Sequence, residues 1–151
     1  MIQRFDAFVT GITVCYKYIQ RIKSAEVTEL GLKGAHVMCM FYLKQHSDGL
    51  TASQLCSLCA EDKAAISRTV SFLKDKGYVS SEGVKNYRSL LRLTAAGKAL
   101  ADQFDNLIAA WVSSGGSGLS DQERRDFYRS LDLISNNLRS KMERDLILNE
   151  V

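Results

Sequence analysis

Apolar residues recur three and four positions apart along most of this 151-residue sequence, which is the spacing of one face of an α-helix. The pattern changes between Tyr78 and Leu93, where two short apolar runs flank a polar segment. The sequence contains no proline, so no residue of that kind interrupts long helices at either end. These features predict a mainly α-helical fold with one small β-hairpin, in the α+β class.

The two ends of the chain carry the longest helical patterns. Apolar residues follow helical spacing from Phe5 to Ile22 and again from Phe127 to Met142. The residues Ser120-Asp121-Gln122-Glu123 fit a capping box, which marks the start of the last helix. Another helix is expected from residue 94 up to the Gly/Ser run 113–118, which is expected to form a flexible turn.

The middle of the chain predicts helix, short helix, helix and hairpin in that order. The first of these helices is expected over about 32–46. The residues Thr51-Ala52-Ser53-Gln54 fit a second capping box, and Asp62 is expected to cap the next helix, which ends at Gly77. The strands are expected at 78–80 and 90–93. This order of elements is typical of a winged helix-turn-helix.

Composition excludes several classes of protein. Hydrophobic residues make up 46% of the chain and charged residues 25%, which indicates a globular core rather than a disordered tail. Four cysteines are too few for a small disulfide scaffold. The longest apolar run is about half of the ~20 residues that a membrane span needs. A single domain, soluble and cytoplasmic, without membrane contact is therefore expected.

Charge is distributed unevenly although the net charge is only +3. Residues 1–49 carry +2, residues 50–93 carry +3 and residues 94–151 carry −2. The most basic segment therefore coincides with the predicted winged helix-turn-helix. This supports a polyanion partner such as double-stranded DNA, although an asymmetry of this size also arises by chance.

The helix after Asp62 is the predicted reading helix. If Ile66, Val70 and Leu73 face the core, the opposite face suits a major groove, because small residues permit close approach and an arginine pairs with guanine. The alternative interpretation is an ordinary solvated helix face. The hairpin loop adds a basic cluster with an aromatic residue, which suits a minor groove or phosphates. The candidate DNA-binding residues are Lys63, Ala64, Ser67 and Arg68 on the helix and Lys85, Asn86, Tyr87 and Arg88 in the loop.

Four motifs in order resemble the MarR family of bacterial transcriptional regulators. They are the runs Gly49-Leu50-Thr51-Ala52-Ser53-Gln54-Leu55, Asp62-Lys63-Ala64-Ala65-Ile66-Ser67-Arg68, Leu73-Lys74-Asp75-Lys76-Gly77-Tyr78-Val79 and Leu93-Thr94-Ala95-Ala96-Gly97. The segment from Gly118 to Arg124 also resembles the beginning of the family's last helix. The resemblance covers nearly the whole chain.

The resemblance implies a homodimeric, sequence-specific DNA-binding regulator, most often a repressor, on a pseudo-palindromic operator. It assigns phosphate contacts to Thr51 and Ser53 and base contacts to the reading-helix residues. The loop departs from the family pattern, because Lys85, Asn86 and Tyr87 stand where many members have an Asp-Arg-Arg triplet. Arg88 or Lys85 is then the candidate replacement for the minor-groove arginine, unless the loop contacts only the DNA backbone. A winged-helix module that binds protein and has lost DNA binding is a further alternative.

Dimerisation is also expected from the residues themselves. The apolar stripes of the first and last helices exceed what one compact lobe needs, and exposing them would invite aggregation. The single MarR-like domain of residues 1–151 then divides into dimerisation helices at 1–30 and 95–151 and a winged helix-turn-helix lobe at 31–94. The candidate dimerisation residues are Phe5, Phe8, Ile12, Trp111, Phe127, Leu131, Ile134 and Leu138.

The cysteines suggest an alternative, a thiol-based redox-responsive regulator. Cys56 and Cys59 form a C-x-x-C motif, but it lies inside a predicted helix, which favours buried structural thiols over a thioredoxin-like site. Cys15 lies near the expected buried face of the first helix, and one peroxide-sensing branch of the MarR family uses a cysteine in that helix. The sequence offers no convincing set of zinc ligands.

Small-molecule binding is expected only from the resemblance. Family members bind small aromatic anions between the dimer helices and the reading lobe, and His36, Phe41 and Tyr42 are the candidates to line that crevice. An ordinary core role is the alternative. No nucleophile with a base, no phosphate-binding glycine loop and no paired carboxylates stand at convincing spacing. We therefore expect neither an enzyme nor a cofactor.

Overall fold

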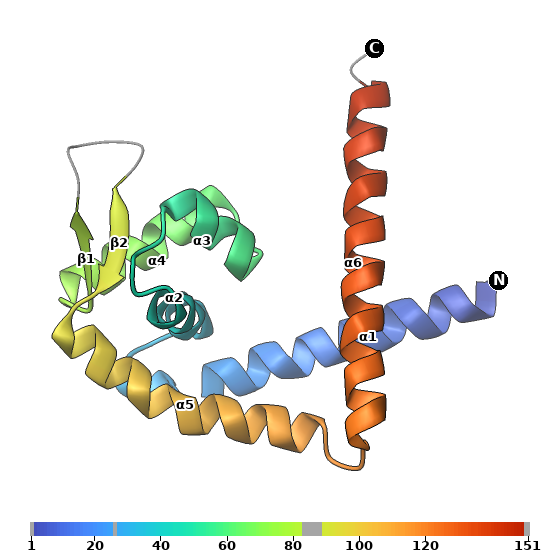
Figure 1. Cartoon of the computed structure of the whole chain (residues 1–151), viewed down its shortest axis with the longest axis horizontal. Helices are drawn as coiled ribbons and strands as arrows, with labels where there is room; N and C mark the ends of the chain where they lie inside the picture. Colours follow the sequence, from blue (N-terminus) through green and yellow to red (C-terminus); the bar gives the residue numbers. More distant parts are fainter. Residues whose placement is uncertain (1, 26, 83–88, 150–151) are drawn as a thin grey trace. The chain divides into compact units, whose positions relative to one another are not determined.

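The computed structural model describes residues 2–25, 27–82 and 89–149, and it confirms a mainly helical chain with one hairpin (Figure 1). It divides into two compact units, Met1–Ala109 and Ala110–Val151. The elements in chain order are α1 (Ile2–Ala25), the 3₁₀ helix η1 (Thr28–Leu30), α2 (Gly34–Gln45), α3 (Ala52–Cys59), α4 (Lys63–Asp75), β1 (Val79–Glu82), β2 (Leu90–Leu93), α5 (Ala95–Gly115) and α6 (Asp121–Asn149).

The helix starts follow the predicted capping residues. Thr51 Oγ1 accepts the N–H of Gln54 at 3.3 Å, and the Gln54 side chain accepts the N–H of Thr51 at 2.8 Å. Asp62 Oδ1 accepts the N–H of Ala65 at 2.7 Å and thereby caps α4. These bonds satisfy backbone donors that have no partner within the helix, so each helix begins at a defined residue.

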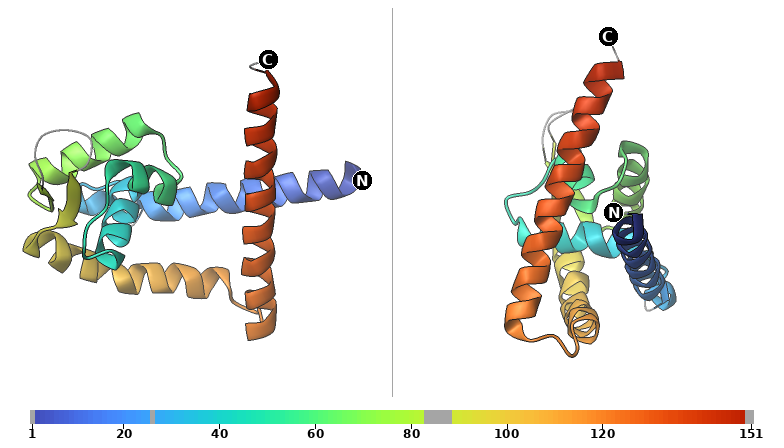
Figure 2. Two further views of the ribbon diagram at one scale, coloured as in Figure 1. Left: turned by 45° about the horizontal axis from the view of Figure 1, so that its top comes forward. Right: turned by 90° about the vertical axis from the view of Figure 1, so that its right-hand side faces the viewer.

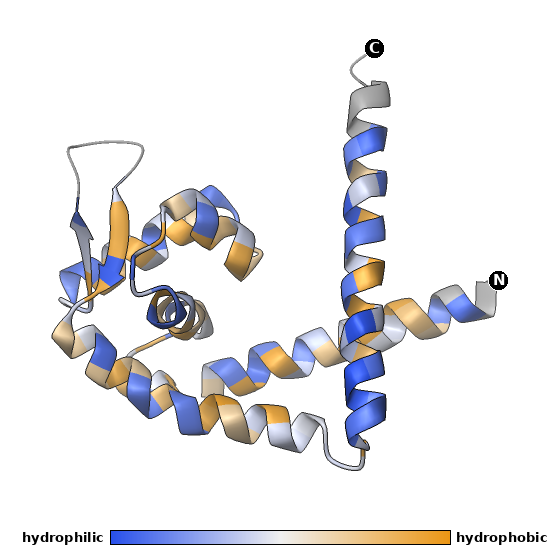
Figure 3. Cartoon of the chain, viewed as in Figure 1, coloured by the Kyte–Doolittle hydropathy of each residue, from blue (hydrophilic) through white to orange (hydrophobic). Residues whose placement is uncertain are grey.

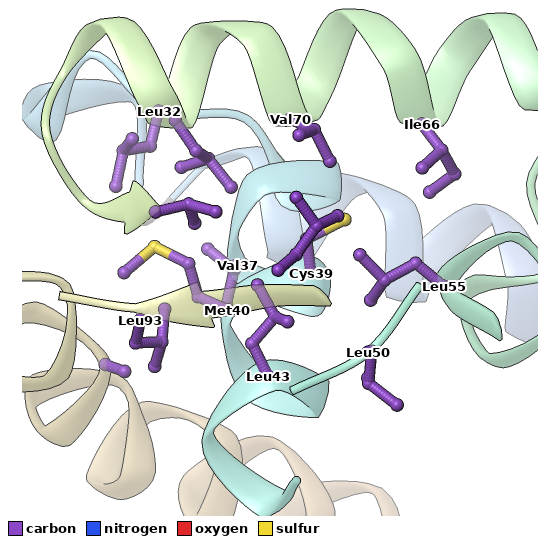
Figure 4. Packing of buried hydrophobic residues seen from close by; sticks show 14 of the residues in the cluster. Leu32, Val37, Cys39, Met40, Leu43, Leu50, Leu55, Ile66, Val70 and Leu93 are labelled. Atoms are coloured by element: carbon purple, nitrogen blue, oxygen red, sulfur yellow. The ribbon is translucent and has the colours of Figure 1, made fainter. Parts of the chain in front are cut away.

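The core of the first unit is built around α2. Val37, Met40 and Leu43 of this helix are fully or almost fully buried, and they are surrounded by apolar residues from α3, α4, both strands and α5. Figure 4 shows these side chains pointing toward one another between α2, α4 and the hairpin. Burial of a side chain of this size contributes about 1.5–3 kcal/mol. The buried set outside α2 is Val27, Leu32, Leu50, Leu55, Ile66, Val70, Leu73, Val79, Leu91, Leu93, Ala101 and Phe104.

The hairpin is antiparallel, and it is also paired with the segment just before α3. Its register pairs Val79 with Leu93 and Glu82 with Leu90, and Leu91 also bridges to Leu50 just before α3. In two orientations the hairpin lies beside α2 and α4 (Figure 2). The same backbone pairing therefore fixes the hairpin and the start of α3 relative to each other.

The second unit contains the end of α5 and the whole of α6. The Gly/Ser run was expected to be a turn, but residues 113–115 continue α5 and only the residues after Gly115 form the turn. The predicted capping box of α6 is present, since Ser120 Oγ accepts the N–H of Glu123 at 3.3 Å and Glu123 accepts that of Ser120 at 2.8 Å. The Ser120 hydroxyl also donates to Glu123 Oε2 at 2.6 Å, and this bond, together with the one from the Ser120 N–H, holds the pKa of Glu123 below its usual value.

Both terminal helices keep exposed apolar side chains in the single chain. Ile12 on α1 is 42% exposed and Leu138 on α6 is 56% exposed. Figure 3 shows apolar and polar residues alternating along each of these helices. Within the described residues, none of the helices combines the length and the apolar character that crossing a membrane requires.

Candidate nucleic-acid interface

The turn between α3 and α4 is short and is closed by backbone hydrogen bonds. Ala60 adopts the left-handed conformation with φ of 52°, and the N–H of Glu61 donates to the carbonyl of Cys56 at 3.1 Å. Asp62 then starts α4 directly. This tight connection holds the two helices in a helix-turn-helix arrangement, as the sequence predicts.

One face of α4 is buried and the opposite face is open to solvent. Ile66, Val70 and Leu73 pack into the core as predicted, and the Thr69 side chain is also buried. The side chains of the opposite face are all exposed, which confirms their predicted position without testing their role. We call these residues the reading face: Lys63, Ala64, Ser67 and Arg68.

The two residues assigned to phosphate contacts differ in their surroundings. Thr51 is half-buried, and its hydroxyl donates to Gln54 Oε1 at 2.9 Å while it accepts the Gln54 N–H. A bond from this hydroxyl to phosphate therefore requires it to leave Gln54. Ser53 lies exposed in the first turn of α3. The structure thus gives Thr51 a capping role, and its phosphate contact stays a prediction.

An arginine that the sequence did not single out ties the hairpin to the turn before α3. Arg92 of β2 donates from Nη1 to Glu82 Oε2 at 2.7 Å, and from Nε and Nη2 to the carbonyl of Asp48 at 3.1 and 2.9 Å. These bonds join both strands to the turn before α3. The alternation of Arg92 with buried Leu91 and Leu93 indicates a polar outer face, but the two partners follow only from the fold. The predicted wing residues Lys85, Asn86, Tyr87 and Arg88 lie outside the described residues.

The candidate ligand residues do not share one environment. His36 is buried at the start of α2, where its Nδ1 accepts the N–H of Lys33 at 3.0 Å and its ring stacks on Phe72 with centroids 4.2 Å apart. Burial, together with the charge of Lys33, lowers the pKa of His36. Phe41 and Tyr42 are half-buried near the other end of α2 and meet edge to face. Their role as a ligand crevice stays a prediction.

The dimerisation candidates are described within their own units. Phe8 on α1 is half-buried, while the side chain of Phe5 is outside the description. On α6, Phe127 is 51% exposed, and Leu131 and Ile134 are half-buried. The indole Nε1 of Trp111 is buried and has no hydrogen-bond partner among the described residues.

The thiols are arranged differently from the sequence expectation. All four cysteines are free, and Cys15 is exposed in the single chain, although periodicity placed it near a buried face. Cys39 Sγ of α2 lies 3.8 Å from Cys59 Sγ of α3, so these two neighbouring thiols come from different helices. Among the described residues, no three His, Cys, Asp or Glu side chains gather as a metal site.

Comparison with solved structures identifies the fold. A MarR-family transcriptional regulator from Silicibacter pomeroyi is 25% identical, with a TM-score of 0.73 over 83% of this chain and 86% of that chain. A MarR transcriptional regulator from Methanosarcina mazei Go1 is 22% identical, with a TM-score of 0.76 over 89% of this chain and 98% of that chain. MepR from S. aureus, solved in complex with DNA, is 17% identical, with a TM-score of 0.75 over 84% of this chain and 93% of that chain.

The sequence itself matches no family model and no curated protein. The structural neighbours are transcriptional regulators, which agrees with the prediction that the chain is not an enzyme. The architecture of these neighbours and the ordered motifs around Thr51, Asp62, Gly77 and Gly97 point to the same fold. The chain has the winged helix-turn-helix fold of the MarR family of transcriptional regulators.

Proposed function

We propose that this chain is a DNA-binding transcriptional regulator of the MarR type, which acts as a homodimer on a pseudo-palindromic operator. The observation that carries the proposal is the reading face of α4, exposed opposite a fully packed face and held by a capped turn. An exposed helix face that lacked the packed opposite face and the capped turn would not by itself indicate DNA binding. The setting matches the way a recognition helix is presented to a major groove.

The chemistry of the reading face fits base and phosphate contacts. Ala64 and Ser67 are small and let the helix approach the floor of the groove, while Arg68 reaches guanine with two parallel hydrogen bonds. Lys63 stands at the first position of α4, where the helix N-terminus itself favours phosphate. Ser53 on the neighbouring α3 supplies a hydroxyl on the same helix-turn-helix.

The dimer is supported by apolar side chains that one chain leaves in water. Tyr16, Ile19 and Ile22 on α1 and Phe127 and Leu138 on α6 are each at least 40% exposed. Exposed apolar surface of this extent is typical of an interaction site, and a second copy of the chain buries it symmetrically. Two-fold symmetry then places the two copies of α4 in major grooves about 34–36 Å apart.

The remaining parts of the proposal concern regulation. We infer a repressor that acts in the cytoplasm and responds to a small aromatic ligand, for which His36, Phe41 and Tyr42 remain the candidate contacts. The wing loop, with Lys85 and Arg88, is the candidate for the flanking minor groove. These assignments rest on the family resemblance.

Binding to DNA is tested by fluorescence anisotropy with duplexes tiled across the region upstream of the protein's own gene. We expect one tile to bind tightly and its affinity to fall steeply as salt rises, because contacts to phosphates release counterions. The variant Arg68→Ala should weaken binding to that tile by about 1–3 kcal/mol and reduce its preference over other tiles. Arg125→Ala, on the exposed surface of α6, is the matched control and should bind as the wild type does.

Two results would contradict the proposal. Equal binding of Arg68→Ala and Arg125→Ala would remove α4 as the reader. Absence of DNA binding together with recovery of a protein partner at high salt would favour the protein-interaction alternative.

A further inference from the structure

Two thiols from different helices meet in the core of the first unit. Cys39 Sγ of α2 lies 3.8 Å from Cys59 Sγ, the last residue of α3. Cys39 is fully buried, whereas Cys59 is half-buried and is the more exposed residue of the two. Both are free thiols, and DNA binding as proposed above uses neither of them.

We propose that Cys39 and Cys59 form a redox-active dithiol, which a hydroperoxide oxidises to an intramolecular disulfide. Their sulfur separation is within reach of bond formation, since a disulfide needs about 2.05 Å and side-chain rotation with a small helix shift covers the difference. The bridge would link residues 20 positions apart, on two helices that already pack against each other.

The reaction balances with the hydroperoxide as the only oxidant. The Cys59 thiolate attacks the outer oxygen of the hydroperoxide, the O–O bond breaks, and the alkoxide takes up the proton that Cys59 released and leaves as an alcohol. Cys59 is then a sulfenic acid. Cys39 Sγ attacks Cys59 Sγ, and the displaced hydroxide leaves as water with the Cys39 proton. Two thiols lose two electrons in total, and the peroxide gains them.

The surroundings assign different roles to the two sulfurs. The hydrogen bond from the Cys39 thiol lowers the pKa of Cys59, assisted by the charge of Lys23, while burial and Glu61 act in the opposite direction. The same hydrogen bond and burial raise the pKa of Cys39. Because the thiolate is the nucleophile, Cys59 is the residue that meets the oxidant, and Cys39 is the one that resolves the sulfenic acid.

The C-x-x-C motif is the wrong pair for this chemistry. Cys56 and Cys59 are three residues apart on α3, where β-carbons are about 5–6 Å apart, whereas a disulfide needs about 3.5–4.5 Å. Bridging them would require the end of α3 to unwind. The sequence suggested the pair Cys56 and Cys59, whereas the sulfur contact in the structure is between Cys39 and Cys59.

The disulfide would lie next to the turn that leads from α3 into the reading face of α4. Cys59 is followed by Ala60 in its left-handed conformation and by Asp62, which caps α4. Closing the sulfur gap pulls the end of α3 toward α2 and displaces this turn, and with it the first residues of α4. The consequence for DNA rests on the proposed function: oxidation should weaken operator binding by about tenfold, which corresponds to the loss of one base contact.

The disulfide is tested first without DNA. The full-length protein is treated with stoichiometric alkyl hydroperoxide, and its tryptic peptides are mapped by mass spectrometry without reduction. We expect the peptide 34–44 joined to the peptide 45–63, with the pair two hydrogens lighter than the free peptides and restored by dithiothreitol. Cys15→Ser and Cys56→Ser should keep this link, and Cys59→Ser should lose it.

Operator affinity of the reduced and oxidised forms is then compared in the wild type and in Cys59→Ser. An internal bridge within peptide 45–63, or no link in Cys56→Ser, would overturn the assignment of the pair. A complete Cys39–Cys59 bridge with unchanged operator affinity would overturn its regulatory effect. Failure of the reduced protein to bind any operator would instead refute the proposed function and leave the peptide map standing.

Discussion

Gly97 lies where the start of α5 passes closest to the backbone before β1. A β-carbon built on Gly97 stands 2.0 Å from the carbonyl oxygen of Tyr78, and ordinary contact would need a separation about 1.5 Å larger. The carbonyl is held in place, because it accepts the N–H of Thr94 at 3.0 Å. Thr94 Oγ1 in turn donates to the carbonyl of Gly77 at 2.6 Å and accepts the Gly97 N–H at 3.1 Å.

The variant Gly97→Ala should therefore destabilise the fold. Overpacking against an immobile backbone costs about 1–3 kcal/mol, and the gain in helix propensity is at most about 1 kcal/mol in a first turn. We expect a net loss of about 2 kcal/mol, which lowers the melting temperature by about 4–8 °C in a chain of this length. Urea and thermal unfolding, followed by circular dichroism at one protein concentration, measure this loss.

Gly115→Ala is the matched control on the same helix. The built β-carbon at Gly115 meets no atom within 4 Å, so the substitution should change the free energy of unfolding by less than about 0.5 kcal/mol. Equal stability of Gly97→Ala and the wild type would refute the close approach. The glycine of the Leu-Thr-x-x-Gly motif would then have no steric reason to be a glycine.

Three further predictions concern the site and its supports. Arg92→Lys should preserve the fold but weaken operator binding measured by anisotropy, because a lysine lacks the planar fork whose separate nitrogens bond Glu82 and the Asp48 carbonyl. Unchanged affinity would show that these bonds do not position the wing. Thr51→Ala should lower the free energy of unfolding, measured in urea, by about 0.5–2 kcal/mol through loss of the cap. The exposed control Ser53→Ala should be nearly neutral, and equal losses of stability in the two variants would contradict the capping role of Thr51. His36 has a lowered pKa when folded, so below pH 6.5 the unfolded chain binds a proton that the folded chain does not, and stability should fall as the pH drops below about 7. The His36→Gln variant should lose this part of the slope, and an unchanged slope would assign it to other groups.

Local signals were sufficient for most element boundaries. The capping boxes at Thr51 and Ser120 involve residues within one helical turn, so their geometry follows from adjacent sequence. The strand at 90–93 was predicted with its observed bounds, since Leu90, Leu91 and Leu93 stand between clear breaks in the pattern. The 3₁₀ helix at 28–30 was missed, because one short turn carries no periodic signal.

Contacts between elements were beyond reach of the sequence. The sulfur contact between Cys39 and Cys59 depends on how α2 crosses α3, and the stacking of His36 on Phe72 depends on how α2 meets α4. The reading face was predictable, because the burial of Ile66, Val70 and Leu73 determines which side of α4 stays exposed. The contacts of Arg92 could not be predicted, because its partners Glu82 and Asp48 come from two other segments.

Two copies of α4 are proposed to read two half-sites of one operator, and hydroxyl-radical footprinting of the tightest-binding duplex tests this arrangement. We expect two protected patches whose centres lie one helical turn apart, about 10–10.5 base pairs, with protection lost in Arg68→Ala. A single patch, no protection at concentrations that saturate binding, or a footprint unchanged in Arg68→Ala would contradict it.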